Sequence, residues 1–532
     1  MNRETIAQRL QEGQGVLGVE LGSTRIKAVL IGEDHAPLAS GDYTWENRLE
    51  NGVWTYSLED AWTGLQQAYA ALKKDVLARY GVKLTKLAGF GVSGMMHGYL
   101  PFDAEGKQLA PFRTWRNTMT GAAAQELTEL INFQIPQRWS IAHLYQAILN
   151  GEAHLSRLAQ LTTLAGYIHH QLTGRNVVGV CEASGMFPID SVTGDYDERM
   201  LALVQEKIAA HGYAWRLRDV LPQVLPAGAD AGTITPQGAL LLDPSGELLP
   251  GAAACPPEGD AATGMVATNS VAVCTGNVSA GTSAFAMVVL EKPLSRVYPE
   301  IDMVTTPSGK PVAMVHCNNC TSDINAWAGV LKGFAQAAKL DVSMNDIFTA
   351  VFNAALEGEP DCGGVVNLPM LSGEPIVDLE EGRPMVVRTP QARMTFANFS
   401  RSLVCGAMAG LKIGMRILDA EHVRIDSLTG HGGYFKTPVV GQRLLAAALN
   451  TPIAVMETAG EGGPWGMALL AAFCVRKQAG QTLEEYLQNC VFADAASTLQ
   501  APQPEDVAGF QAYTERFQQA LTAEKAAVEL QA

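Results

Sequence analysis

The sequence predicts a two-domain α/β protein, and three observations carry the prediction. The chain has 532 residues, which is more than one hydrophobic core usually supports. Short apolar runs alternate with segments whose apolar residues recur at helical spacing, as in α/β folds. Residues 15–32 and 271–290 each predict a strand, a turn of Gly, Ser and Thr, and a second strand. We therefore expect two domains, at residues 1–257 and 258–532.

The first half of the chain alternates predicted strands and helices. In the opening hairpin, Glu20 stands at the end of the first strand, just before the turn. In residues 56–81, Ser57 followed by Asp60 predicts a helix that begins with a capping box. Further along we expect a buried strand at 86–94, a Gly-rich loop at 94–103, a strand and loop at 109–117, and mostly helix from 121 to 172.

The second half repeats this alternation. Residues 256–270 predict a loop that enters a helix, with Asp260 in the loop. After the hairpin at 271–290, residues 424–450 and 452–473 each predict a strand, a Gly-rich loop and a helix. Residues 502–530 predict a C-terminal helix that packs on the body or on another subunit, which leaves a homodimer open.

Composition excludes some classes of function. Hydrophobic residues make up 47% of the chain and charged residues 17%, as in ordinary globular proteins, and the formal net charge is -16. A nucleic acid or an anionic membrane needs clustered Lys and Arg, so neither is an expected partner. Residues 1–15 do not resemble a signal peptide, no apolar run predicts a membrane span, and the nine Cys are scattered. These features favour a cytoplasmic protein with reduced thiols.

The two turns of Gly, Ser and Thr are candidate phosphate sites. Gly22-Ser23-Thr24 and Gly281-Thr282-Ser283 expose backbone N–H groups and hydroxyls, which together can bind an anion. Hairpins also use such residues for steric reasons alone. The sequence contains neither a P-loop nor a G-x-G-x-x-G motif after a strand, which disfavours a P-loop NTPase and a dinucleotide dehydrogenase.

Two acids are candidates for chemistry. Asp260 precedes a predicted helix, where a carboxylate is often only a cap. A positioned carboxylate can instead take the proton of a sugar hydroxyl, and a second one, such as Glu20, can help to hold Mg²⁺.

Other polar residues suit a small polyol. His97 follows a buried strand between glycines, and Trp115, Arg116 and Asn117 offer a flat face and donors. Cys317 and Cys320 form the one close Cys pair, without the second pair that a structural zinc usually needs, so we expect two buried thiols.

The ordered set of motifs resembles the FGGY family of carbohydrate kinases over nearly the whole chain. GVELGSTRIKAVL resembles the family's first phosphate hairpin, GVSGMMHGYLPFDAEG a segment of its xylulokinase branch, and LPGAAACPPEGDAATGM the segment with the catalytic aspartate. Five further segments resemble the family in the same order: PFRTWRN, GNVSAGTSA, NLPMLSGEPI, LTGHGGYFKTPVVGQRLLAAALNTPI and GEGGPWGMALLAA.

The resemblance implies two ribonuclease-H-like domains of the actin and hexokinase superfamily, with a deep cleft between them that holds ATP and Mg²⁺. It implies Asp260 as the general base, with Glu20 and Asp260 near the metal, partly through water. The implied ATP-binding residues are Gly22, Ser23, Thr24, Gly281, Thr282, Gly432, Gly433 and Lys436. The implied sugar-binding residues are Met96, His97, Arg116, Asn117 and Asp260.

The chain also departs from the family pattern. Glu20 stands where the family usually has Asp, Ala261 where the xylulokinase branch often has Asn, and SGEPIV lacks the usual Arg-Thr after its Glu. We expect phosphorylation of a ketopentose such as xylulose, and ribulose, ketohexoses and polyols stay open. Two rivals remain. One is a sugar sensor with little turnover, and the other is an ATPase of the chaperone or actin type, which would not explain SGMMHG and TWRN.

Overall fold

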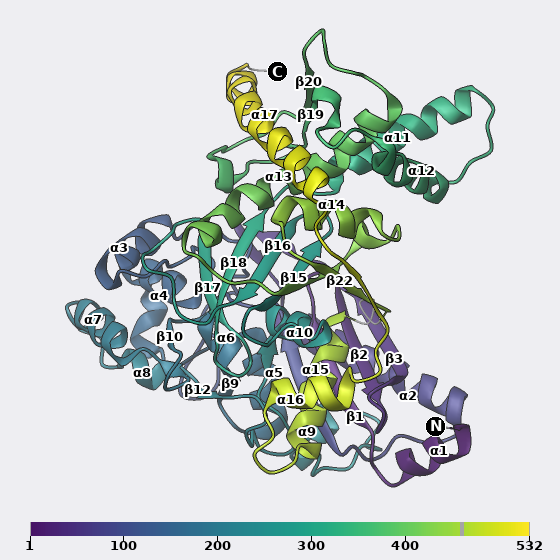
Figure 1. Cartoon of the computed structure of the whole chain (residues 1–532). Helices are drawn as coiled ribbons and strands as arrows, with labels where there is room; N and C mark the ends of the chain where they lie inside the picture. The colour runs from purple at the N-terminus through teal and green to yellow at the C-terminus, as the bar shows by residue number, and fades with distance from the viewer. Residues whose placement is uncertain (1, 458–461, 531–532) are drawn as a thin grey trace. The chain divides into compact units, whose positions relative to one another are not determined.

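The computed structural model describes residues 2–457 and 462–530, and these form two compact units (Figure 1). Unit 1 comprises Met1–Val271, Met303–Pro311 and Glu461–Asp494. Unit 2 comprises Ala272–Asp302, Val312–Gly460 and Ala495–Ala532. Unit 1 thus extends beyond the expected boundary at residue 257, and it also includes a segment from the C-terminal part of the chain.

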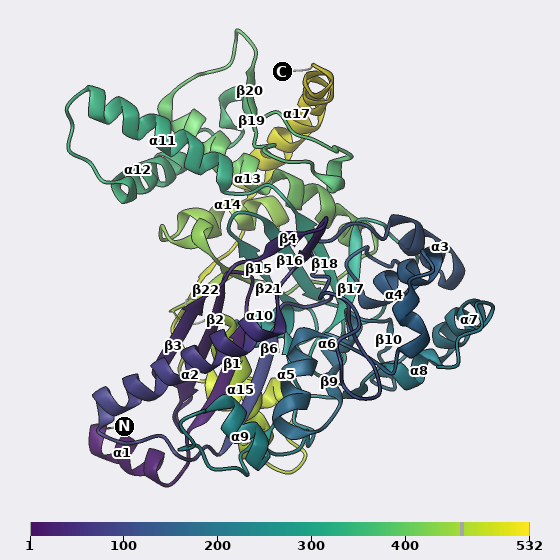
Figure 2. The same cartoon turned by 180° about the vertical axis from the view of Figure 1, so that it is seen from behind.

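Unit 1 is built on a six-stranded sheet in the order β13-β6-β1-β2-β3, with β14 also pairing with β6 (Figure 2). The opening hairpin is confirmed, because β1 and β2 are antiparallel. Strand β6 is parallel to β1, β13 and β14. The strands are β1 (Val16–Leu21), β2 (Arg25–Ile31), β3 (Pro37–Thr44), β6 (Gly89–Gly94), β13 (Ala253–Ala254) and β14 (Glu258–Gly259).

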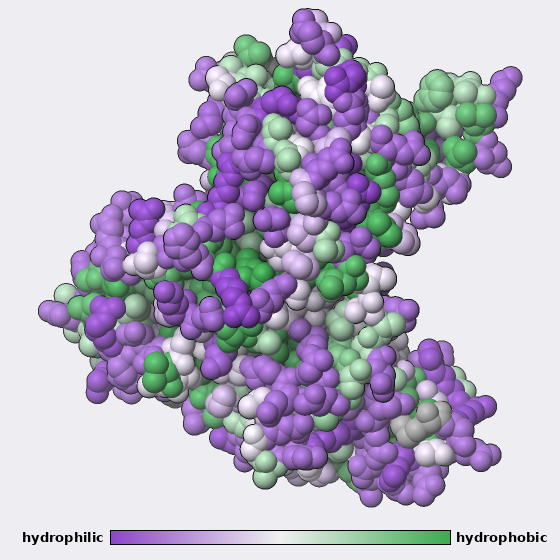
Figure 3. All heavy atoms as spheres, in the orientation of Figure 1, coloured by the Kyte–Doolittle hydropathy of each residue, from purple (hydrophilic) through white to green (hydrophobic). Residues whose placement is uncertain are grey.

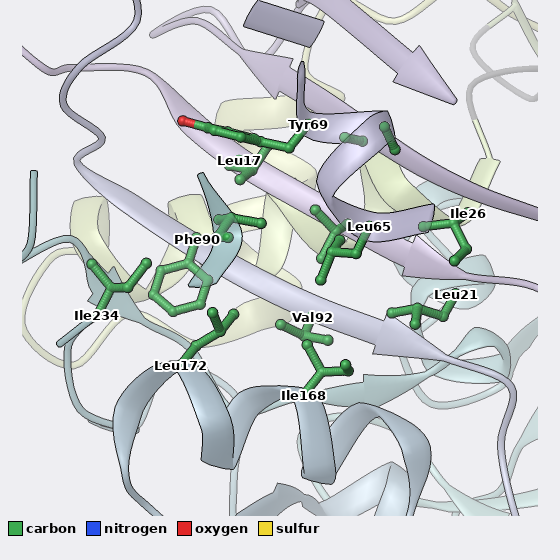
Figure 4. Close-up of a cluster of buried hydrophobic side chains, with 14 of the residues drawn as sticks. Leu17, Leu21, Ile26, Leu65, Tyr69, Phe90, Val92, Ile168, Leu172 and Ile234 are labelled. Carbon is green, nitrogen blue, oxygen red and sulfur yellow. The ribbon is translucent and has the colours of Figure 1, made fainter. Parts of the chain in front are cut away.

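Helices α2 (Leu58–Tyr80) and α5 (Leu164–Thr173) supply the core on one face of this sheet. Figure 4 shows Leu65 and Tyr69 of α2 and Ile168 and Leu172 of α5 around Phe90 of β6. Ser57 caps α2 as predicted by accepting a hydrogen bond from the backbone N of Asp60 at 2.9 Å. The Asp60 carboxylate does not complete the box, because it pairs with Arg48 at 3.0 Å.

The opposite face of β1 lies against α15 (Gly462–Arg476). A Cβ on Gly18 would lie 2.1 Å from the carbonyl oxygen of Pro464 and 2.4 Å from the backbone N of Ala468, so strand and helix backbones touch there. Helix α10 (Asp260–Ala267) packs on α15 in turn. This packing places both helices in unit 1, although the sequence analysis assigned them to the second domain.

One predicted strand is wrong. Residues 109–117 form no strand in the described structure, and their pairing is limited to a single bridge between Arg113 and Tyr99. Pro111 has no N–H to donate to a strand ladder, which explains why pairing does not extend. The mostly helical stretch after residue 121 is confirmed by α3, α4 and α5.

The remaining elements of unit 1 are short. Its other helices are α1 (Arg3–Gln11), α3 (Gly121–Ile131), α4 (Ser140–Leu149), α6 (Val180–Ser184), α7 (Glu198–Ala209), α8 (Leu217–Val220), α9 (Pro236–Leu242) and α16 (Leu483–Tyr486). Its other strands are β4 (Arg48–Glu50), β5 (Val53–Thr55), β7 (Leu100–Phe102), β8 (Gln160–Thr162), β9 (Val177–Gly179), β10 (Ile189–Asp190), β11 (Asp195–Tyr196) and β12 (Gln223–Leu225).

Unit 2 is organised around a seven-stranded sheet in the order β17-β18-β16-β15-β21-β22-β23. The second hairpin is confirmed, because β15 and β16 are antiparallel and β15 continues parallel to β21. The strands are β15 (Thr275–Ala280), β16 (Ala284–Val289), β17 (Ile301–Thr305), β18 (Pro311–Cys317), β21 (Ser427–His431), β22 (Ile453–Met456) and β23 (Ser497–Gln500). A separate pair contains β19 (Val365–Leu368) and β20 (Met385–Arg388).

The helices of unit 2 include the predicted C-terminal helix. They are α11 (Ser322–Ala337), α12 (Met344–Glu357), α13 (Phe396–Ala420), α14 (Val440–Leu449) and α17 (Pro504–Glu529). Asp506 joins α17 to α13 and α14, because its carboxylate accepts from Arg401 of α13 at 2.7 Å and from Arg443 of α14 at 2.6 Å. The predicted Gly-rich loop between β22 and α15 lies partly outside the described residues.

Polar residues dominate the face drawn in Figure 3. Within the described ranges, none of the helices is long and apolar enough to cross a bilayer.

Candidate active site

Three parallel strands of unit 1 end at the same edge of its sheet. Glu20 of β1 and Glu258 of β14 both stand opposite Ser93 of β6, one residue before each strand ends. Ligand sites of open α/β sheets lie at such carboxyl edges. The chain leaves this edge through the first Gly-Ser-Thr turn, through the loop with Met96 and His97, and through Asp260, so the fold brings these predicted residues together.

Asp260 is the first residue of α10. Its Oδ1 accepts from the backbone N of Ala261 at 3.0 Å and from that of Met96 at 3.4 Å. The side chain is open to solvent, yet protein encloses it on most sides, and the resulting desolvation raises its pKa although the backbone N–H groups oppose the shift. Such a carboxylate is fixed in place and is a better proton acceptor than a free aspartate.

Glu20 is the second carboxylate of this edge. Its side chain is 12% exposed and lies 3.6 Å from Lys27 Nζ, across the hairpin. Burial raises the pKa of Glu20, Lys27 lowers it, and the charge of Asp260 raises it further. Two carboxylates that repel one another suit a divalent cation, and their oxygens are the ligands that Mg²⁺ prefers. No group of three or more His, Cys, Asp or Glu in the described ranges could hold a metal ion, so water or phosphate would complete the shell.

Two aromatic residues donate hydrogen bonds to the carbonyl groups of the first Gly-Ser-Thr turn. The Trp45 indole donates to the Gly22 carbonyl at 2.7 Å, and the Tyr56 hydroxyl donates to that of Ser23 at 2.6 Å. The backbone N of Trp45 donates to the Thr24 carbonyl at 3.2 Å. Since the three carbonyl groups of the turn are tied back, its conformation is fixed before any ligand binds.

The second turn and the predicted adenosine-side glycines gather in unit 2. Strands β15 and β21 run in parallel, so Gly281 and Gly432 follow them at the same edge. Gly432 has φ +103°, and a Cβ there would lie 2.4 Å from the Ala280 carbonyl oxygen, so only glycine fits. A Cβ on Gly433 would meet open space, and Lys436 ends the 3₁₀ turn Gly433–Phe435.

Met96 contacts Asp260 in unit 1 through its backbone N, and His97 follows Met96 in the chain. His97 is buried in the left-handed region with φ 72°, and its Nδ1 contacts the Gly185 carbonyl at 3.2 Å. Desolvation lowers the pKa of His97 well below its usual range, so the ring is neutral. Met96 packs on Gly259, where an added Cβ would lie 2.8 Å from the Met96 Cγ.

The two polar residues of the TWRN segment have different environments. The Arg116 guanidinium lies 4.0 Å from the centre of the Trp54 ring and stays exposed. Asn117 is buried, and its amide nitrogen donates to the carbonyls of Trp54 at 2.8 Å and Thr114 at 3.0 Å. Because both amide hydrogens are used inside the protein, the geometry favours a structural role for Asn117 over a sugar contact.

Sequence reasoning missed several residues of this edge. Glu182 of α6 is fully buried, and its Oε2 would lie 2.5 Å from a Cβ on Gly259. Its backbone N donates to Glu258 Oε2 at 2.8 Å, and burial raises the pKa of Glu258 to about 8. Nothing in the sequence links α6 to Asp260, whereas Lys27 could have been found from the hairpin register, which pairs it with Glu20.

Comparison with known proteins identifies the family of the chain. The N-terminal domain of the FGGY family of carbohydrate kinases matches residues 15–243, and its C-terminal domain matches residues 276–475. The chain belongs to the FGGY family of carbohydrate kinases. This FGGY kinase is therefore a phosphotransferase that acts on a sugar and uses ATP.

Individual relatives are distant from this FGGY kinase. A xylulose kinase of Haemophilus influenzae is 19% identical over 83% of this chain and 87% of its own. A ligand-bound xylulose kinase from Lactobacillus acidophilus has a TM-score of 0.76 at 16% identity, covering 96% of this chain and 98% of that one. A gluconate kinase from the same organism has a TM-score of 0.77 at 16% identity with the same coverage. The fold alone therefore does not select the sugar.

Proposed function

We propose that this FGGY kinase transfers the terminal phosphate of ATP to a terminal hydroxyl of a ketopentose such as xylulose, with Asp260 as the general base. The observation that carries the proposal is the Asp260 carboxylate, held by the backbone N–H groups of Ala261 and Met96 at the carboxyl edge of the sheet. The xylulose kinases among the similar proteins support the choice of sugar.

In this proposal the chain's residues divide the work of phosphoryl transfer. Asp260 accepts the proton of the attacking hydroxyl, which contributes about 10²–10⁴-fold to such reactions. His97, Met96 and Arg116 orient the sugar. Glu20 and Asp260 would hold Mg²⁺, partly through water, and the ion would neutralise phosphate charge.

The phosphates belong to the two turns of Gly, Ser and Thr. Ser23 and Thr24 of the first turn and Gly281 and Thr282 of the second offer backbone N–H groups and hydroxyls. Gly432, Gly433 and Lys436 face the adenosine side. Lys27, which the sequence analysis did not single out, adds a positive charge beside Glu20.

One observation favours the alternative of a sugar-binding protein with little turnover. Glu20 is longer than the usual Asp and already pairs with Lys27. An internal cation that occupies this carboxylate would compete with Mg²⁺ for it.

The test is ADP release with Mg²⁺-ATP across ketopentoses, ketohexoses, aldoses and polyols, with a control that lacks sugar. Stimulation by one sugar identifies the substrate, and Asp260→Ala should then lose at least 10²-fold in kcat while it still binds that sugar in calorimetry. A flat panel at the rate without sugar contradicts the proposal. In that case sugar binding without turnover would support the sensor, and fast turnover without sugar would support an ATPase.

A further inference from the structure

Two motifs that the proposed mechanism leaves without a role lie together in unit 2. One is the end of β18 at Cys317 with the loop that follows it through Cys320, and the other is the block Ser372-Gly373-Glu374. Asn318 Nδ2 donates to the Gly373 carbonyl at 2.8 Å, which joins the two segments. They are more than fifty residues apart in the chain.

The loop after β18 holds the second phosphate turn. The backbone N of Cys320 donates to the Thr282 carbonyl at 3.1 Å, and that of Thr321 to the Gly281 carbonyl at 3.0 Å. The Thr321 hydroxyl also donates to the Gly281 carbonyl, at 2.7 Å. Since these bonds use the carbonyl groups of the turn, they fix the direction in which its other groups point. The arrangement corresponds to the one that Trp45 and Tyr56 provide for the first turn.

Glu374 in turn holds this loop. Its carboxylate is almost fully buried, with the residue 1% exposed. Glu374 Oε2 accepts from the backbone N of Asn319 and from its Nδ2, each at 3.1 Å. Asn319 also donates to the Ser372 carbonyl at 3.0 Å and accepts from the backbone N of Ser372 at 3.0 Å. Burial of a carboxylate is unfavourable unless the group is hydrogen-bonded, and the hydrogen bonds from Asn319 offset this cost for Glu374.

Residues around the network fill space. In place of the family's usual Arg-Thr after the glutamate stand Pro375 and Ile376, and an added Cβ on Gly414 of α13 would lie 2.8 Å from Ile376 Cδ1. Cys317 and Cys320 are 1% exposed, and burial raises the pKa of both thiols. The pair is thus two buried thiols, as the sequence analysis expects, and it flanks the two asparagines.

We propose that Glu374, acting through Asn319 and the loop up to Thr321, is a positioning residue that holds the Gly281-Thr282 turn in the conformation that binds nucleotide phosphate. The inference rests on the proposed function, since it takes this turn to be a phosphate site. Glu374 itself touches neither sugar nor nucleotide.

The experiment measures Mg²⁺-ADP binding by calorimetry in the full chain without sugar, together with KM for ATP and for the sugar found by ADP release. We expect Glu374→Ala to weaken Mg²⁺-ADP binding about tenfold or more, because buried hydrogen bonds to a charged group are lost. KM for ATP should rise in parallel, while KM for the sugar stays within about twofold of the wild type.

Two further variants make the result specific. Glu374→Gln keeps an oxygen that can accept from Asn319 and should fall between the wild type and Glu374→Ala, and it serves as the test if the alanine variant does not fold. Glu380→Ala, six residues along the same segment and exposed, should bind Mg²⁺-ADP like the wild type.

Three results would overturn the inference. They are unchanged Mg²⁺-ADP binding in folded Glu374 variants, an equal loss in Glu380→Ala, and a rise in KM for sugar without one for ATP. If the wild-type chain does not bind Mg²⁺-ADP in calorimetry, both the proposed nucleotide site and this inference are wrong. A flat sugar panel with normal Mg²⁺-ADP binding fails the proposed function alone, because the calorimetry needs no sugar.

Discussion

The substitution Gly463→Ala tests whether the position of the Glu20 carboxylate governs turnover. Gly463 is the second residue of α15, and a Cβ there would lie 2.0 Å from Glu20 Oε1 and 3.1 Å from Thr263 Oγ1. Nonbonded carbon and oxygen atoms need roughly 3 Å or more, so Oε1 has to move by about 1 Å. Displacements of this size in an active site can cost about 10²-fold in rate.

The protein should remain folded, because the end of the Glu20 side chain can rotate away. Alanine is also the better helix former, so the free energy of unfolding should stay within about 1 kcal/mol of the wild type. We expect kcat in the ADP-release assay to fall about 10²-fold at saturating Mg²⁺-ATP and sugar.

Gly121→Ala is the matched control for this prediction. Gly121 opens helix α3 in the same unit, and an added Cβ would have no contact closer than 3.8 Å. This variant should retain wild-type kcat and a similar melting temperature. A folded Gly463→Ala enzyme with kcat within a factor of two of the wild type would refute the reasoning, because Glu20 could then move without effect.

Two further predictions concern stability. His35 is buried against the Tyr486 hydroxyl at 2.6 Å, and desolvation lowers its pKa to about 4. Below pH 6.5 the unfolded chain therefore binds a proton at this residue that the folded chain excludes, so His35 alone should lower stability by about 2 kcal/mol between pH 7 and pH 5. In urea unfolding the stability of His35→Asn, which tolerates the left-handed backbone (φ 62°), should change over this range by about 2 kcal/mol in its favour relative to the wild type, and the same pH dependence in both proteins would contradict the assignment. Asp506→Ala leaves the buried Arg401 without its carboxylate and should lower the free energy of unfolding by about 3–5 kcal/mol. Asp419→Ala is the control: Asp419 pairs with Lys412 but is 62% exposed, so its loss should lower the free energy of unfolding by at most about 1 kcal/mol. Similar losses of unfolding free energy in the two variants would show that the buried ion pairs of Asp506 stabilise the fold no more than an exposed pair does.

Local patterns in the sequence were enough for most of the elements. Apolar runs interrupted by a small turn specify the two hairpins, because strand pairing there involves neighbours in the chain. Ser57 and Gly81 mark the ends of α2 by their own backbone chemistry. The strand expected at 109–117 is absent for a local reason too, because Pro111 has no N–H to donate to a strand ladder.

The candidate site was only partly predictable. Asp260 and His97 follow strand ends and Glu20 lies one residue before one, and strand ends are visible in sequence. Asn117 appeared to be a free donor, but its amide is used by the backbone around Trp54, a segment some sixty residues earlier in the chain. Such a contact depends on how distant segments pack, which periodicity does not report.

The sequence by itself determined the family, the two Gly-Ser-Thr hairpins and the acids beside them, because each depends on residues that are close in the chain. Only the tertiary structure decided which helices complete unit 1 and that Glu182 lies under Gly259. It also decided that Glu374 holds the loop behind the second turn. These features arise from burial and from hydrogen bonds between segments far apart in the chain, and a buried carboxylate looks like any other glutamate until its neighbours are in place.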